Sequence, residues 1–338
     1  MCVRWFYDPA APGDLREYRT VLGVIQASPE APFSARTAAG ANDAGMTTVL
    51  QRPTVLLLAV SRPWFWPVSW VPAYLGTVLA GHAWLPSRAD APRAAAALLV
   101  LGPLIWGAVL AQNDLHDLPS DRMNPRKATA PLVTGAVSAH RLRIWYALLA
   151  LASVAVALFV GPLFVLGVAG VLVLGWAYSV PPLRLKTRPG WDVAVNALVV
   201  GVVSPAAGWA ITRPPWGFPW QFALIGVLFA AALYVPTTVT DLAADRDAGY
   251  TTFAVRYGHR LAHRIGVALW GCALAVSIVC AALDVLVPRS TLTAQLVMAP
   301  VLLAAYAMLT RRPTIARLAV VSVLFGVPTV GFALAYIG

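Results

Sequence analysis

Long apolar segments recur along this chain, and they constrain its fold more than any other feature of the sequence. A helix needs about 20 apolar residues to cross the hydrocarbon core of a bilayer. Runs of about that length are found near residues 54–80, 94–112, 142–160, 162–179, 191–212, 218–238, 264–284, 294–310 and 316–337. The sequence therefore predicts an all-helical membrane protein with about nine transmembrane helices.

The content of charged residues agrees with this interpretation. The chain is 59% hydrophobic and 12% charged, whereas soluble proteins carry about 25% charged residues. Residues 1–50 differ from the rest, because they are rich in Pro, Ala, Gly, Asp and Arg and lack a long apolar run. We expect a disordered cytosolic tail over 1–50, without a signal peptide, followed by one transmembrane domain over 51–338.

The basic residues indicate the orientation of the chain. Its net charge is +11, but the bases form no nucleic-acid-binding motif or stripe. They concentrate in the connections after the even-numbered spans, and basic loops face the cytoplasm. We expect an integral protein of the cell membrane that contacts the bilayer and no nucleic acid, with its N-terminus and these connections on the cytoplasmic side. Its oligomeric state stays open.

Acidic residues are few and clustered. Beyond residue 100 there are eight aspartates and no glutamate, and six of the eight fall within residues 114–121 and 241–247. Carboxylates beside hydrocarbon are rare and mark functional sites. Both clusters follow even-numbered spans, so we expect them on one side of the membrane, facing one cavity.

The spacing in these clusters favours a metal site. Asp114, Asp117 and Asp121 are spaced i, i+3, i+7, which places them on one face of a helix. Such close like charges repel unless a cation lies among them, and oxygen ligands without His or Cys select a hard ion such as Mg²⁺. The candidate metal ligands are Asn113, Asp114, Asp117, Asp121, Asp241 and Asp245. The alternative is a pair of helix ends with solvated charges.

A metal held by carboxylates suits a diphosphate, because the ion neutralises charge on the departing phosphate oxygens. Bases on the same connections would bind that group: Arg122, Arg126, Lys127, Arg184, Lys186 and Arg246. The neighbouring spans supply aromatic residues: Trp64, Phe65, Trp66, Trp70, Trp106, Trp176, Tyr178, Trp209 and Tyr234. An apolar, aromatic cavity would suit a long isoprenoid chain, and aromatic faces stabilise cations.

Three segments resemble the motifs of UbiA-type intramembrane prenyltransferases. Residues 113–121, NDLHDLPSD, resemble the first motif NDxxDxxxD; residues 178–186, YSVPPLRLK, resemble YSxPPxRLK; residues 241–245, DLAAD, resemble the second motif DxxxD. They occur in family order over roughly residues 50–338. The resemblance implies a helical bundle around a central cavity and Mg²⁺-dependent transfer of a prenyl group from its diphosphate.

The resemblance also implies roles for individual residues. Asp114, Asp117, Asp241 and Asp245 become the catalytic residues, which hold Mg²⁺ and diphosphate together with Asn113. The bases named above become the diphosphate ligands. The chain departs from the common family pattern at four positions, which leave its branch of the family open: Ala130 in place of Arg, Ala243 and Ala244 in place of Glu-Gly, and the additional Asp247.

Three functions are compatible with these motifs. The first is transfer of the prenyl group to an aromatic, quinone-precursor or lipid-like acceptor. The second is a terpene cyclase of the same scaffold, in which the isoprenoid chain captures its own cation. The third, of a different class, is a membrane transporter that binds diphosphates without chemistry. Neither the prenyl chain length nor the acceptor follows from the sequence.

Overall fold

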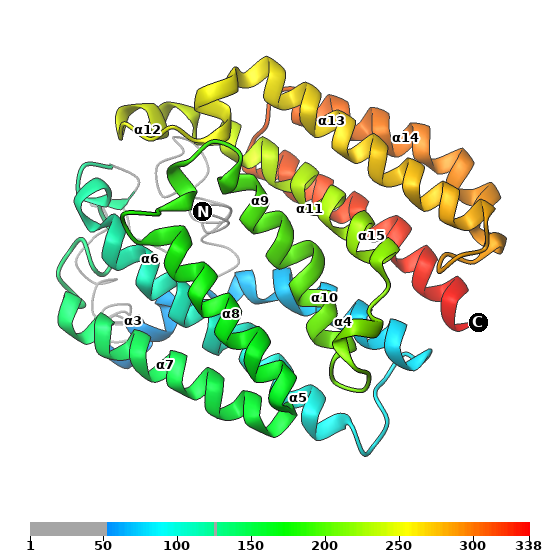
Figure 1. Cartoon of the computed structure of the whole chain (residues 1–338). Helices are drawn as coiled ribbons and strands as arrows, with labels where there is room; N and C mark the ends of the chain where they lie inside the picture. The colour runs from blue at the N-terminus through cyan, green and yellow to red at the C-terminus, as the bar shows by residue number, and fades with distance from the viewer. Residues whose placement is uncertain (1–52, 125–126) are drawn as a thin grey trace, which may run out of the picture.

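The computed structural model describes residues 53–124 and 127–338, which form helices and no strand (Figure 1). The predicted tail over residues 1–50 lies outside the described residues. The α-helices are α3 (Pro53–Val60), α4 (Trp66–Gly81), α5 (Ala91–Leu99), α6 (Ile105–Asp121), α7 (Ala139–Val160), α8 (Pro162–Ser179), α9 (Trp191–Leu198), α10 (Ser204–Trp209), α11 (Trp220–Thr240), α12 (Leu242–Asp247), α13 (Phe253–Ala282), α14 (Leu292–Thr310) and α15 (Ile315–Ile337).

Eight helical segments of the described chain are long and apolar enough to cross a membrane. They are Ala91–Asp121, Ala139–Val160, Pro162–Ser179, Trp191–Trp209, Trp220–Thr240, Phe253–Ala282, Arg289–Thr310 and Ile315–Ile337. The first and fourth of these are continuous through short π-helical turns, η4 (Val100–Leu104) and η7 (Val199–Val203). An integral membrane protein with an all-helical fold is therefore confirmed, and the expected count of about nine spans is close.

The remaining expected span, 54–80, is divided. Helix α3 ends at Val60, a 3₁₀ turn η3 covers Pro63–Phe65, and α4 begins at Trp66. Arg62 has a φ of 47°, in the left-handed region, and the ring of the following Pro63 disfavours the helical conformation at the residue before it. The break therefore has a local cause, and it places a charged residue inside an otherwise apolar run.

The helices pack as neighbours in the order of the chain. Helix α6 packs against α7 and α8, α11 packs against α9 and α13, and α14 lies between α13 and α15. Figure 1 shows the connections α6–α7, α8–α9 and α11–α13 at one end of the bundle. The three motif segments lie in these connections or in the last turns of α6 and α8 beside them, so the fold brings them to one end of the bundle.

Helices α4 and α10 cross at very close range because both have a glycine at the contact. A Cβ atom at Gly208 would overlap the carbonyl oxygen of Ala73, and one at Gly76 would overlap that of Pro205. Small residues allow such close backbone approach between membrane helices. This contact joins α4, the second part of the divided segment, to α10.

We expect the substitution Gly208→Ala to destabilise the protein by about 1–3 kcal/mol, the usual effect of inserting a methyl group into a filled contact. The control is Gly170→Ala in α8, where nothing lies within 4 Å of the added Cβ. Both changes replace a helical glycine by alanine. The difference between their thermal unfolding midpoints in detergent therefore measures how much the close contact between α4 and α10 contributes to stability. Equal midpoints for the two variants would show that the crossing tolerates a side chain.

Candidate active site

Asp117 is the centre of a polar cluster at the end of the bundle. Its Oδ1 accepts hydrogen bonds from Lys186 Nζ at 2.6 Å and Arg184 Nη2 at 2.9 Å. Its Oδ2 accepts from Asn113 Nδ2 at 3.0 Å. Lys186 Nζ also donates to Asn113 Oδ1 at 2.8 Å. Because Asn113 and Asp117 are one helical turn apart on α6, they present a joint surface to which the segment after α8 binds.

Lys186 is buried, with 2% of its surface exposed. Burial lowers the pKa of its ammonium group, and the carboxylate of Asp117 partly offsets this effect. A buried charge needs a partner of opposite sign, and Asp117 supplies it. Arg184, two residues earlier, has a φ of 38°. Backbone strain of this kind is found at functional sites, where surrounding contacts maintain it.

Asp114 has a cation of its own, which the sequence analysis missed. Arg62 Nη2 lies 2.9 Å from Asp114 Oδ1 and 3.1 Å from Oδ2. Arg62 comes from the break between α3 and α4, so that break delivers the cation to the site. A signal was present in the sequence, because an arginine inside an apolar run is costly in a membrane. About two turns after Asp114 on α6, Asp121 Oδ2 lies 3.5 Å from Lys127 Nζ.

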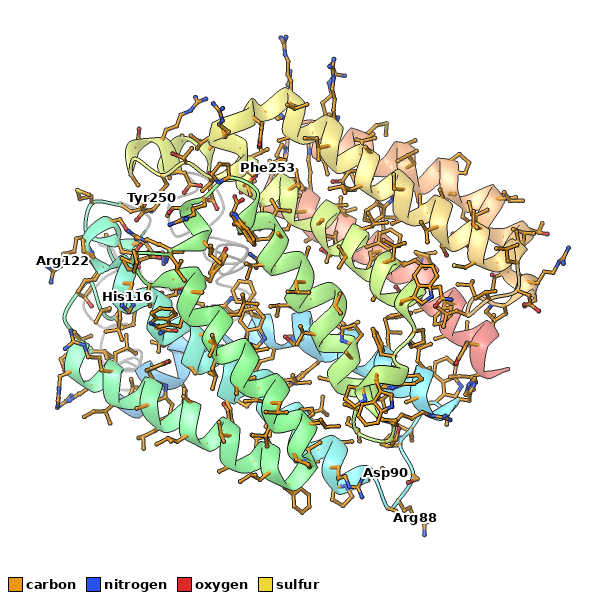
Figure 2. The ribbon with its side chains drawn as sticks, in the orientation of Figure 1. Arg88, Asp90, His116, Arg122, Tyr250 and Phe253 are labelled. Atoms are coloured by element: carbon orange, nitrogen blue, oxygen red, sulfur yellow. The ribbon has the colours of Figure 1, made fainter. Side chains whose placement is uncertain are left out.

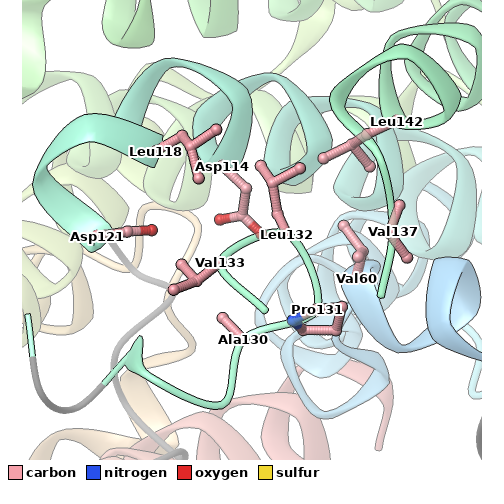
Figure 3. A pocket seen from close by; sticks show the side chains of 10 residues that line it. All are labelled: Val60, Asp114, Leu118, Asp121, Ala130, Pro131, Leu132, Val133, Val137 and Leu142. Atoms are coloured by element: carbon pink, nitrogen blue, oxygen red, sulfur yellow. The ribbon is translucent and has the colours of Figure 1, made fainter. Parts of the chain in front are cut away.

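A small cavity of about 20 Å³ lies beside this face of α6 (Figure 3). Asp114 and Asp121 both line it, and the chain that leads to α7 closes its other side with apolar residues such as Leu132 and Val133. This volume is sufficient for about one water-sized group. Two carboxylates therefore share one small space.

The second aspartate cluster is also buried where it matches the motif. Asp241 follows the last residue of α11 and Asp245 lies in α12, with 5% and 0% of their surfaces exposed. Asp245 Oδ2 accepts a hydrogen bond from Thr252 Oγ1 at 3.0 Å. The neighbouring Arg246 and Asp247 are exposed. The additional acid of this cluster is thus separate from the buried pair.

Tyr250, just after α12, connects the second cluster to the first. Its hydroxyl accepts from Arg184 Nη2 at 2.9 Å and donates to Ser120 Oγ at 2.8 Å. Figure 2 shows Tyr250 at the same end of the bundle as His116 and Arg122. The connection that follows the second motif therefore contacts both the first motif and the segment after α8.

Asp192 supports the same end of the bundle, and the sequence analysis assigned it no role. Its side chain is fully buried. Its Oδ1 accepts from the backbone N–H of Gly190 at 2.9 Å, and its Oδ2 accepts from that of Phe253 at 2.8 Å. Asp192 thus holds the first residue of α13 against the segment that carries Arg184 and Lys186. An isolated acid at the start of an apolar span was the signal for it.

A second cavity, of about 90 Å³, extends from the polar cluster into the bundle. Most of its wall is apolar, and its lining comes from α4, α6, α8, α9 and η7: Ser69, Ile105, Trp106, Val109, Leu110, Asn113, Val171, Leu174, Gly175, Tyr178, Ser179, Val195, Asn196 and Val199. Of the aromatic residues predicted to surround a cavity, Trp106 and Tyr178 line this one. The Tyr178 hydroxyl lies 3.1 Å from that of Tyr234. Asp241 and Asp245 line neither this cavity nor the smaller one.

Two arginine N–H groups at the site lack acceptors. Arg62 Nη1 and Arg184 Nε are buried, and neither has a hydrogen-bond partner in the described part of the chain. Buried donors almost always have a partner, so each of these two can serve an acceptor that the described residues do not supply. The two arginines pair with Asp114 and Asp117, which are about one helical turn apart on α6.

The other predicted ligands are placed less centrally. Arg122 is exposed and points away from the bundle (Figure 2). Arg246 is exposed as well. Arg126 lies outside the described residues. The assignment of these three to a phosphate group therefore stays a prediction.

The residues present are compatible with Mg²⁺. Among the described residues, no three His, Cys, Asp or Glu side chains are grouped closely enough to hold a metal ion. Mg²⁺, however, binds through one or two carboxylates and fills its shell with water and phosphate oxygens. The carboxylates of Asp114 and Asp121, which line the small cavity, are a donor set of that kind. Asn113 Oδ1 instead accepts from Lys186, and Asn113 lines the larger cavity.

Comparisons with known proteins agree with this geometry. A homogentisate phytyltransferase from Synechocystis sp. is 30% identical over 178 residues, which span 50% of this chain and 57% of that protein. A lycopene elongase/hydratase from Haloarcula japonica is 31% identical over 223 residues, covering 63% of this chain and 71% of that protein. The matched region thus leaves a substantial part of each relative uncovered.

The fold has solved counterparts. The structure of a UbiA homolog from Archaeoglobus fulgidus bound to GPP and Mg²⁺ superposes with a TM-score of 0.65, at 23% identity, over 83% of this chain and 99% of that one. The profile of the UbiA prenyltransferase family matches residues 69–325. That region contains all three motif segments and every residue that lines the larger cavity. The chain therefore belongs to the UbiA prenyltransferase family.

Proposed function

We propose that this protein transfers a prenyl group from an isoprenoid diphosphate to an aromatic, quinone-precursor or lipid-like acceptor, with Mg²⁺ as cofactor. One observation carries the proposal: Arg62 and Arg184, which pair with Asp114 and Asp117 of α6, have buried N–H groups without a partner among the described residues, and Asn113 of the same helix lines an apolar cavity. An isoprenoid diphosphate has the matching shape, with a charged head and an apolar tail. The names of the relatives support it, since two of them act on isoprenoids.

The roles of the residues follow from their positions. Asp114 and Asp117, with Asn113 and Asp121, would hold Mg²⁺ from α6. Asp241, between α11 and α12, and Asp245, in α12, would approach the same head group. When bound, the ion neutralises the charge that builds on the departing diphosphate. The basic residues around Asp117 donate hydrogen bonds to phosphate oxygens, which stabilises the same charge and holds the reacting carbon in place.

The apolar cavity completes the reaction site. It excludes water from the allylic carbon, whose bond to the diphosphate oxygen breaks with the electron pair leaving on oxygen. The ring of Tyr178 or Trp106 faces the cavity, where an aromatic surface stabilises a cation. The acceptor's nucleophilic atom then forms the new bond and loses its proton. From the distribution of basic loops, we place this site on the cytoplasmic side of the cell membrane.

Diphosphate release by the full chain in detergent tests the proposal. Geranyl, farnesyl and geranylgeranyl diphosphate are supplied with Mg²⁺ or with EDTA, with and without a lipid and quinone-precursor extract. We expect release that requires both Mg²⁺ and the extract, and a product whose mass equals acceptor plus prenyl group less one proton. Release without the extract, together with a cyclic hydrocarbon or alcohol, would identify a terpene cyclase. Binding without release would identify a transporter.

A further inference from the structure

The hydroxyl group of Tyr250 has no part in the mechanism above, yet it occupies a central position. Tyr250 lies directly after Gly249, outside the DxxxD motif, in the connection between α12 and α13. Its ring is partly buried. Its hydroxyl oxygen contacts both Ser120 of the first motif and Arg184 of the segment after α8.

A short chain of hydrogen bonds passes through this oxygen. Arg184 Nη2 donates to Tyr250 at 2.9 Å, Tyr250 donates to Ser120 Oγ at 2.8 Å, and Ser120 donates to the backbone carbonyl of Asp117 at 2.9 Å. The guanidinium carbon of Arg184 also lies 4.9 Å from the centroid of the Tyr250 ring. Tyr250 therefore contacts the arginine through both its ring and its hydroxyl.

We propose that Tyr250 is a positioning residue for the prenyl diphosphate: its hydroxyl orients Arg184 on Asp117 and joins the second-motif loop to α6. This inference rests on the function proposed above. The Nη2 atom of Arg184 has two acceptors, Asp117 and Tyr250, which together define the plane of the guanidinium group. A guanidinium group is a rigid fork, so fixing Nη2 also fixes the direction of Nε, the buried donor without a partner.

The variant Tyr250→Phe removes the hydroxyl and keeps the ring. A hydrogen bond to a charged group contributes enough that its loss weakens binding about 10- to 100-fold. We expect KM for the donor to rise by about tenfold or more on this scale, with kcat changed by less than about threefold because Arg184 still pairs with Asp117. The dissociation constant for geranyl thiolodiphosphate, a donor analogue that resists cleavage, should rise by the same factor as KM.

A purely structural role predicts a different pattern. If only the ring mattered, Tyr250→Phe would behave as wild type and Tyr250→Ala would lose thermal stability. The matched control is Tyr257→Phe, near the start of α13, whose side chain is 45% exposed. It removes a hydroxyl from the same segment, and we expect no change in KM, in analogue binding or in the unfolding midpoint.

Ser120→Ala is a second test variant. It removes the group that accepts from the Tyr250 hydroxyl, while the hydrogen bond from Arg184 to Tyr250 can still form. If one hydrogen-bonded chain positions Arg184, Ser120→Ala and Tyr250→Phe raise the analogue's dissociation constant by similar factors, and the double variant is no worse than the single ones. Multiplied effects in the double variant would show that the two residues act separately, which contradicts the proposal.

The two proposals fail in different ways. If the wild-type protein releases no diphosphate from any donor, the prenyltransferase function is wrong, and analogue binding still decides the role of Tyr250. If the wild type is active while Tyr250→Phe retains wild-type KM and wild-type analogue binding, only the inference about Tyr250 is overturned.

Discussion

The substitution Asp117→Asn should abolish most diphosphate release and destabilise the protein as well. Asp117 balances both Lys186 and Arg184, and Lys186 is almost completely buried. Removing one partner of a buried ion pair costs about 3–5 kcal/mol. Asparagine keeps the shape of the side chain, so any loss of activity or stability is due to removal of the negative charge. We expect kcat/KM to fall by about 100- to 1,000-fold, the usual effect of removing one preorganised group that stabilises charge in the reaction.

The control for Asp117→Asn is Asp247→Asn, which neutralises an exposed acid of the second cluster. It changes the net charge by the same amount and should leave activity and unfolding temperature within error of the wild type. Retention of more than about a tenth of wild-type activity in Asp117→Asn would contradict a central role for this carboxylate, because a tenfold loss corresponds to only about 1.4 kcal/mol.

Lys186→Met should separate catalysis from stability. Methionine resembles the lysine side chain in length and suits an apolar environment, and Arg184 still balances Asp117. The variant loses a charge-assisted donor to the phosphate oxygens, so we expect activity to fall by about 100-fold. Its unfolding temperature should drop less than that of Asp117→Asn, because no buried charge is left alone.

The double variant Asp117→Asn with Lys186→Met tests the same reasoning. It removes both charges of the buried pair, which is often neutral for stability, so it should unfold at a higher temperature than Asp117→Asn alone while remaining inactive. Arg188→Met, at an exposed position two residues further, is the control for loss of a cation. An unfolding temperature for the double variant below that of both single variants would show that the pair stabilises the fold independently of its charges.

The helices and the meeting of the motifs were predictable because each depends on local pattern. Hydropathy locates the spans, and the i, i+3, i+7 spacing places Asp114 and Asp117 on one face of α6. The break at Arg62 was not predicted. The mean hydropathy of the expected span 54–80 is dominated by apolar residues, so a single arginine has little effect on it. A closer examination of the dipeptide Arg62-Pro63 would have suggested it.

The detailed partners of the site depend on tertiary structure and were beyond reach. The sequence indicated that the carboxylates need cations, and it named Lys186 and Arg184 among the bases. It could not show that Arg62 would pair with Asp114, since 52 residues separate them and only the packing of α3 and α4 brings them together. The partner of Asp192 was out of reach for the same reason, because Phe253 lies 61 residues away.

The ion pairs along α6 have a consequence for the protein between turnovers. Asp114, Asp117 and Asp121 each have a basic partner within the chain. The site is thus electrically compensated before any ligand arrives, and the folded state does not depend on ligand to relieve repulsion among its acids. The folded chain can therefore remain in the bilayer with these acids paired while the site holds no ligand.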